Sequence, residues 1–179
     1  MEATSSFATL LLSRPLDLSA IWRLSSCHRV TNRKTAAAAS KQPRSYTTSL
    51  TGLRPKSPLR LAALVREGLP FRTLEVFGER SRFSVAGVAA LIDVPDRTLV
   101  RRKAEGRLTA NESDRFFRVA RIFGLAVGLF EGDIDAAKAW FERPQRGLGN
   151  VSPATAVRTD IGAREIERLI GRLEHGVVV

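Results

Sequence analysis

The sequence predicts an all-α protein, and three observations lead to this prediction. Between Ser57 and Gly176, apolar residues recur at spacings of three and four, which is the period of a helix that packs on one face. Ser, Thr and Asp residues, twice followed by proline, stand where these periodic segments begin. No segment in this range alternates apolar and polar residues convincingly, as a half-buried strand would.

Each expected helix has its own start or stop signal. The expected starts are Ser57-Pro58, Ser84, Thr109, Asp133, Ser152-Pro153 and Asp160. The expected stops are Gly68, Gly78, Pro144 and Gly176. The longest helix follows Thr109, which forms a capping box with Glu112. Gly124 and Gly128 interrupt this helix, and either close packing against a neighbour or a kink would explain them.

The net charge and the apolar content of the chain limit the classes of partner that we expect. The chain has 179 residues and a formal net charge of +11, and residues 1–57 carry nine Lys or Arg against two acidic residues. A basic balance favours anionic partners, nucleic acid first. No apolar run approaches the roughly 18 residues that span a bilayer, so we expect no membrane partner.

Catalytic and metal chemistry are not expected. Cys27 is the single cysteine, which excludes an internal disulfide framework and a Cys-rich zinc site. His28 and His175 lie far apart in the sequence, and the chain has no nucleophile motif and no phosphate-binding loop. We therefore expect a protein that is not an enzyme, with no catalytic residue, no cofactor and no metal.

Residues 1–56 differ in amino-acid composition from the rest of the chain. They are rich in Ser, Thr, Ala and Arg, are nearly free of acidic residues, and contain the low-complexity run 35–40. This composition resembles an organellar transit peptide, but a disordered basic tail, or residues translated from upstream of the natural start, fit it as well. We favour these two and predict a disordered N-terminal extension over 1–56.

Residues 84–106 are the most informative segment. A short apolar helix, a break at Asp93–Pro95 and a basic second helix are typical of a helix-turn-helix that enters a DNA groove. With Leu99 against the core, Arg97 and Arg101 point to the opposite side, and Thr98 and Arg102 lie on one flank. The predicted DNA-binding residues are Arg97, Thr98, Arg101 and Arg102. The alternative is a solvated basic face on an ordinary helix.

Residues 57–179 resemble the Xre/MbcA/ParS-type antitoxin family. Three blocks carry the resemblance: residues 97–108 with 112–115, the Ala-rich helix ending in Trp140 with Pro144 and Leu148-Gly149, and residues 152–176. The resemblance implies an Xre-like helix-turn-helix DNA-binding region over 57–124 and a small helical toxin-binding domain over 125–179. The family usually has Gly-Gly where this chain has Gly149-Asn150, and Asn also tolerates a positive φ.

The resemblance also implies partners. An antitoxin of this type neutralises a cognate RES-type toxin, which consumes NAD, by blocking its active site, and it binds operator DNA to repress the shared operon. Self-association as a homodimer or higher oligomer and a cytoplasmic location are expected. The predicted toxin-binding residues are Leu148, Gly149, Asn150, Val151, Pro153, His175 and Gly176. The alternative is that Trp140 and Leu148 simply fill the small core between the last helices, and for Trp140 we favour the core.

Two other functions stay open. A stand-alone helix-turn-helix transcriptional regulator whose C-terminal helices only dimerise would share the same DNA-binding segment. An imported organellar protein would explain the composition of residues 1–56.

Overall fold

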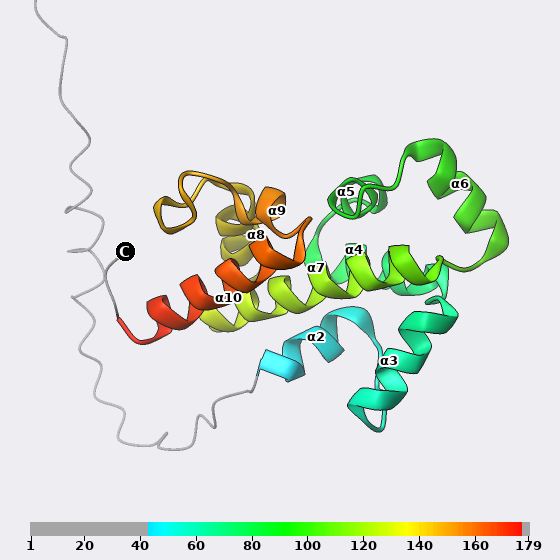
Figure 1. Cartoon of the computed structure of the whole chain (residues 1–179), viewed down its shortest axis with the longest axis horizontal. Coiled ribbons are helices and arrows are strands. Elements are labelled where there is room, and N and C mark those ends of the chain that lie inside the picture. The colour runs from blue at the N-terminus through cyan, green and yellow to red at the C-terminus, as the bar shows by residue number, and fades with distance from the viewer. Residues whose placement is uncertain (1–42, 177–179) are drawn as a thin grey trace, which may run out of the picture. The chain divides into compact units, whose positions relative to one another are not determined.

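The computed structural model describes residues 43–176, and these residues form helices joined by short connections, which confirms the predicted all-α class (Figure 1). The elements are α2 (Pro43–Thr51), α3 (Pro58–Glu67), α4 (Phe71–Ser81), α5 (Val85–Leu91), α6 (Asp96–Glu105), α7 (Ala110–Leu129), α8 (Ile134–Glu142), the 3₁₀ turn η1 (Arg146–Leu148), α9 (Pro153–Ala156) and α10 (Asp160–Glu174). Over the described range, β-type pairing is limited to isolated bridges between Pro70 and Arg107 and between Gln145 and Val151. None of the described helices is both long and apolar enough to cross a bilayer.

The twenty-residue helix α7 runs through the middle of the fold, and α2, α3, α8 and α10 all pack against it (Figure 1). Its N-terminus has the predicted capping box: the Glu112 backbone N–H donates to the Thr109 hydroxyl, and the Glu112 carboxylate accepts from the Thr109 backbone N–H. Ten of its residues are buried, far more than one helical face supplies. The helix is therefore enclosed by its neighbours rather than lying on a surface.

A cluster of phenylalanines joins the two halves of the chain. Phe123 of α7 lies edge-on to Phe77 of α4, to Phe83 in the α4–α5 connection and to Phe141 of α8, with ring centroids 5.3–6.0 Å apart. Edge-to-face pairs of this kind each add about 0.5–1.5 kcal/mol beyond the burial of their area. The helix-turn-helix region and the C-terminal region consequently share one hydrophobic core.

The predicted disordered extension is too long. Residues 43–56 belong to the fold, because α2 packs along α7 and α4 and buries Thr47, Leu50 and Thr51. The rest of the predicted extension, residues 1–42, lies outside the described residues.

Gly124 explains how α2 fits so closely. A Cβ at Gly124 would lie 2.6 Å from the hydroxyl oxygen of Thr47 and 3.0 Å from its backbone nitrogen. A Cβ at Gly128 would meet only the Tyr46 ring, at an ordinary 3.8 Å. The helix α7 is continuous through both glycines, and close packing against α2 explains the glycine at position 124.

The helix expected to stop at Gly78 continues to Ser81. Gly78 is buried, and a Cβ there would lie 3.0 Å from the carbonyl oxygen of Phe83, so this glycine accommodates the returning chain instead of ending the helix. Ser81 is the last residue of the helix, and the next residue, Arg82, caps it in a left-handed conformation with φ of 59°.

The tight crossing leads to a prediction with a built-in control. Gly124→Ala and Gly128→Ala gain the same helix propensity, about 1 kcal/mol, but only the first forces a clash with Thr47. We expect the free energy of unfolding of Gly124→Ala to lie about 1–3 kcal/mol below that of Gly128→Ala, measured by urea denaturation. Equal stabilities would contradict the packing assigned to α2.

Candidate DNA and partner interfaces

The basic helix α6 is held at both ends by the scaffold. At its start, the turn after α5 brings Asp93 into a left-handed conformation and buries Val94, whose backbone N–H donates to the carbonyl of Ala89 at 2.9 Å. Along its length, Leu99 packs against the core, as predicted. These contacts give the α5–turn–α6 unit the geometry of a helix-turn-helix.

The chain that leaves α6 is fixed to the chain between α3 and α4. Leu108 donates its backbone N–H to the carbonyl of Leu69 at 2.9 Å, and the Arg107 guanidinium donates to the carbonyl of Gly68 at 2.9 Å. Gly68 has φ of +90°, and a Cβ there would lie 2.2 Å from the carbonyl oxygen of Leu108. Only glycine fits this position, which sets the direction in which α6 projects.

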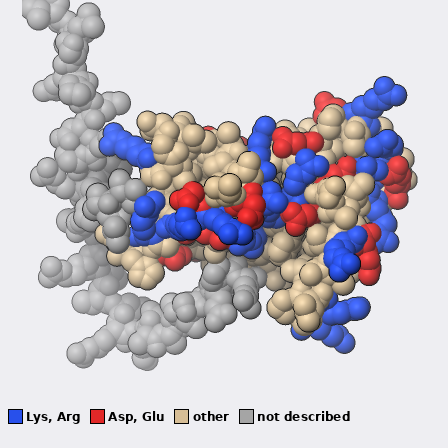
Figure 2. Space-filling view, viewed as in Figure 1, with Lys and Arg blue, Asp and Glu red and all other residues tan. Residues whose placement is uncertain are grey.

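Three of the four predicted DNA-binding residues lie on the outward side of α6. Arg97 and Arg101 are exposed and Thr98 is half-buried on their flank. The Nε atom of Arg101 is 3.8 Å from a carboxylate oxygen of Glu105, a solvent-exposed pair that contributes little to stability. Figure 2 shows Lys and Arg side chains, interspersed with Asp and Glu, over the end of the molecule that carries α6.

Arg102 is placed differently from the other three. Its side chain is only 13% exposed, and its Nε donates to both oxygens of Glu112, at 2.8 and 3.1 Å. Its Nη1 also donates to Glu105 at 2.6 Å. Because two carboxylates engage this guanidinium, we now assign Arg102 to holding α6 against the start of α7, and we remove it from the DNA-contacting set.

Glu112 is the centre of this arrangement. Burial alone would raise the pKa of its carboxyl, but hydrogen bonds from Arg102 and Thr109 outweigh burial and hold the pKa below its usual range. The hydrogen bonds that Arg102 donates, first to Glu112 and then to Glu105, raise the pKa of Arg102. One carboxylate therefore both caps α7 and anchors α6.

A second set of contacts ties the C-terminal region to the helix-turn-helix. Arg158, between α9 and α10, places Nη1 3.2 Å from a carboxylate oxygen of Asp93 and donates from Nη2 to the carbonyl of Ala90 at 3.3 Å. Arg118 of α7 donates to the carbonyl of Arg158 at 3.2 Å. The turn between α5 and α6 is thus contacted, through Asp93, by a residue 65 positions further along the chain.

The predicted toxin-binding loop is a compact turn. Backbone hydrogen bonds from Gln145 N to Val151 O and from Asn150 N to Gln145 O close it, at 3.1 and 2.9 Å. Gly149 and Asn150 both have positive φ, 66° and 62°, so asparagine does take the place of a second glycine. Val151 projects with 40% exposure, whereas Leu148 is partly buried against the core.

The remaining predicted toxin-binding residues divide between core and surface. Pro153, the first residue of α9, is buried. His175 and Gly176 follow α10 and are exposed, and the Nδ1 atom of His175 lies 2.6 Å from the carbonyl oxygen of Gly171. Trp140 is half-buried beside Phe130, in keeping with the core role favoured for it.

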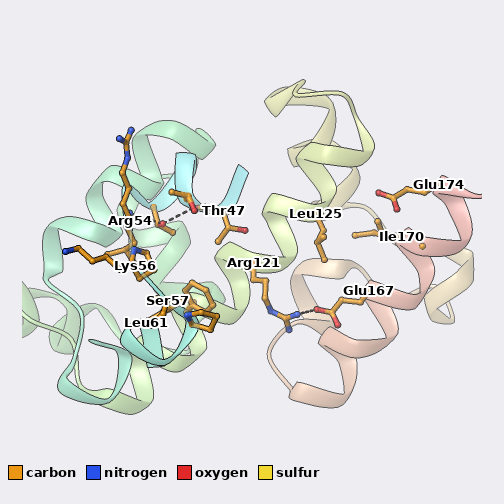
Figure 3. Close-up of a pocket in the computed structure, with 17 residues that line it drawn as sticks. Thr47, Arg54, Lys56, Ser57, Leu61, Arg121, Leu125, Glu167, Ile170 and Glu174 are labelled. Atoms are coloured by element: carbon orange, nitrogen blue, oxygen red, sulfur yellow. Dashed lines mark hydrogen bonds and ion pairs between the residues drawn. The ribbon is translucent and has the colours of Figure 1, made fainter. Parts of the chain in front are cut away.

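A groove that the sequence did not predict lies between α2, the connection to α3, α7 and α10 (Figure 3). It has a volume of about 910 Å³ and is lined largely by apolar atoms, from residues that include Leu53, Leu61, Phe117, Leu125 and Ile170. Arg121 pairs with Glu167 across its floor, and burial lowers the pKa of Arg121 (Figure 3). Its lining comes from three separate segments, within 47–61, 117–125 and 167–174, so no local sequence signal marks it. Across residues 43–176, no cluster of three or more His, Cys, Asp or Glu is arranged to hold a metal ion.

Comparison with known proteins identifies the family. Residues 60–121 match the antitoxin Xre-like helix-turn-helix domain, and residues 125–176 match the antitoxin Xre/MbcA/ParS C-terminal toxin-binding domain. The chain belongs to the Xre/MbcA/ParS antitoxin family. A relative named antitoxin Xre, from Photorhabdus laumondii, is 40% identical over 119 residues, which is 66% of this chain and 80% of the relative.

Two further relatives carry the same name. Antitoxin Xre of Yersinia enterocolitica is 47% identical over 85 residues, covering 47% of this chain and 57% of the relative. Antitoxin Xre of Pseudomonas putida is 32% identical over 84 residues, covering 46% and 52%. The two matched regions of this antitoxin-family chain meet inside α7, so they are joined by a continuous helix.

The Arg102–Glu112 contact predicts a pH-dependent loss of stability. Glu112→Gln removes the charge that two helices share, and we expect a cost of about 1.5–3 kcal/mol near neutral pH. Because the folded-state pKa of Glu112 is lowered, its contribution is present above the unfolded-state pKa and is lost as pH falls through the folded-state pKa. Urea unfolding at a series of pH values should show wild type and variant converging at acidic pH.

Glu105→Gln is the matched control, since the side chain of Glu105 is 48% exposed. We expect it to cost less than Glu112→Gln. An equal cost, or a gap between wild type and Glu112→Gln that does not narrow in acid, would be inconsistent with the assigned role of Glu112.

Proposed function

We propose that this protein is the antitoxin of a type II toxin–antitoxin system, which neutralises a RES-type, NAD-consuming toxin by blocking its active site and represses its own operon by binding operator DNA. The observation that carries the proposal is the succession, on one chain, of a helix-turn-helix match and a toxin-binding-domain match joined through α7. We propose further that it acts in the cytoplasm, as a homodimer or higher oligomer, without enzymatic activity and without a cofactor.

The DNA-binding part of the proposal rests on the outward face of α6. Arg97 and Arg101 are exposed there at an i, i+4 spacing, so both guanidinium groups lie on one line along the helix. Guanidinium groups bind guanine O6 and N7 bidentately, and Thr98 is placed on the flank to reach a phosphate. The N-terminal half of the second helix is the part that meets base edges in this motif.

The toxin-binding part rests on the turn after α8 and on the end of α10. The side chain of Val151 is exposed on a turn that backbone hydrogen bonds close, and a closed turn is a rigid way to present an apolar group. Buried Pro153 and partly buried Leu148 hold the two ends of the turn on the core. We propose that this turn, together with His175 and Gly176, contacts the toxin.

Loss of the outward arginines should strongly weaken operator binding and leave neutralisation intact. Each lost guanidinium contact costs about 1–3 kcal/mol, so Arg97→Ala with Arg101→Ala should weaken binding about 30-fold or more. Electrophoretic mobility shift with DNA from upstream of the protein's own gene measures this. Arg164→Ala with Arg168→Ala is the matched control, because it removes two exposed arginines at the same spacing from α10. Retained sequence-specific binding in the α6 variant would refute the assignment of this face.

Toxin neutralisation is tested on the exposed turn. Val151→Asp places a charge at the proposed interface and should weaken toxin binding by about 2 kcal/mol or more, as loss of a central apolar anchor does. Co-expression with the toxin encoded beside the antitoxin gives two measurements, the amount of toxin that co-purifies and the intracellular NAD level. Leu59→Asp is the control, because Leu59 is 83% exposed on α3.

If no toxin co-purifies with the wild-type protein while operator binding persists, a stand-alone transcriptional regulator replaces the antitoxin proposal. If Val151→Asp still protects cells and still co-purifies, the turn is not the contact.

A further inference from the structure

Val100 is an exposed apolar side chain in the middle of α6. It is 70% exposed. Among the described residues, the other large apolar side chains with comparable exposure, Leu59 and Ile161, are each the second residue of a helix, where the neighbouring turn is incomplete. Val100 instead has a complete helical turn on each side.

Val100 does not belong to the hydrophobic core of the described residues. The inward side of α6 is formed by Leu99, which packs on the core, and Arg102, which pairs with Glu112. Valine is also a weaker helix former than alanine, because its branched side chain loses rotamer freedom. An exposed valine at a central helical position thus lowers local helix stability without joining the hydrophobic core of the described residues.

The neighbours of Val100 indicate what its methyl groups would meet. At about 100° per residue, Val100 lies about 60° from Arg97 and about 100° from Arg101 around the helix, on the edge of the outward side opposite Thr98. The small Ala104, also exposed, follows one turn later. The outward side therefore combines two guanidinium groups with one apolar branched group.

We propose that Val100 determines sequence specificity by packing against the C5-methyl group of a thymine in the major groove. This inference rests on the proposed DNA binding and adds to it a residue and a base. The thymine methyl is the apolar group that base edges present in the major groove, while Arg97 and Arg101 can satisfy only hydrogen-bond acceptors there. A helix seated by its arginines places an adjacent valine at the depth of the base edges.

Uracil-substituted DNA tests the proposal directly. A duplex is first selected from a randomised library by the wild-type protein and is then synthesised with deoxyuridine at one thymine at a time, which removes a single methyl group. We expect wild type to bind the duplex about fourfold more weakly when the contacted thymine is replaced, the fold-change for one buried methyl group. Val100→Ala should bind the thymine duplex about fourfold more weakly than wild type and bind thymine and uracil duplexes equally.

Each outcome separates the inference from the function beneath it. If selection enriches no sequence, the proposed operator binding fails and Val100 loses its role with it. If a sequence is enriched but wild type tolerates every uracil, or Val100→Ala discriminates as wild type does, the Val100 inference alone is overturned. Leu59→Ala, which trims an exposed leucine on α3, should discriminate as wild type does. Because Val100 is exposed, Val100→Ala should unfold at the same urea concentration as wild type or a higher one.

Discussion

The burial of α7 is the constraint on which the rest of the structure depends. A helix with ten buried residues cannot be covered by one partner, and here α2, α3, α8 and α10 cover different faces of it while α4 and α8 meet it through the phenylalanine cluster. The first matched region ends on this helix and the second begins on it, so both include part of its buried surface. A substitution in the buried face of α7 is therefore expected to affect the proposed DNA binding and the proposed toxin binding together, and only surface substitutions separate the two.

This constraint also explains why arginines that are adjacent in sequence have different roles. Glu112 is the third residue of α7 and is already oriented by its capping bond to Thr109, so its carboxylate is fixed where α6 passes. Arg102 is the residue of α6 that faces this carboxylate, and pairing satisfies a charge that would otherwise be buried alone. The capping box was evident in the sequence, but a second use of the same carboxylate depends on how α6 crosses α7, which spacing within one helix does not reveal.

Local signals predicted most of the helices, and non-local contacts account for the misses. Caps such as Ser84 and Thr109 act within four residues, so the sequence alone located them. Helix α2 was missed because it is nine residues long, has no acidic residue in its first turn and is stabilised by packing on α7. The glycine at position 124 indicated that a neighbouring segment packs closely on α7, but it did not indicate which segment. The helix end predicted at Gly78 was wrong for the same reason, since a glycine at a close contact cannot be told from a glycine at a helix end in the sequence.

Helix α6 has four basic residues, but only two of them are placed on its outward side. Glu105 lies 2.6 Å from Arg102 but 3.8 Å from Arg101, so this carboxylate engages mainly the arginine that already faces inward. Lys103 lies 3.9 Å from Glu75 of α4, on the side away from Arg97 and Arg101. Two guanidinium groups are left on the outward side of α6, and two charges alone supply little affinity by neutralising phosphates. We therefore expect the proposed DNA recognition by this face to depend also on base contacts, the kind of contact proposed for Val100.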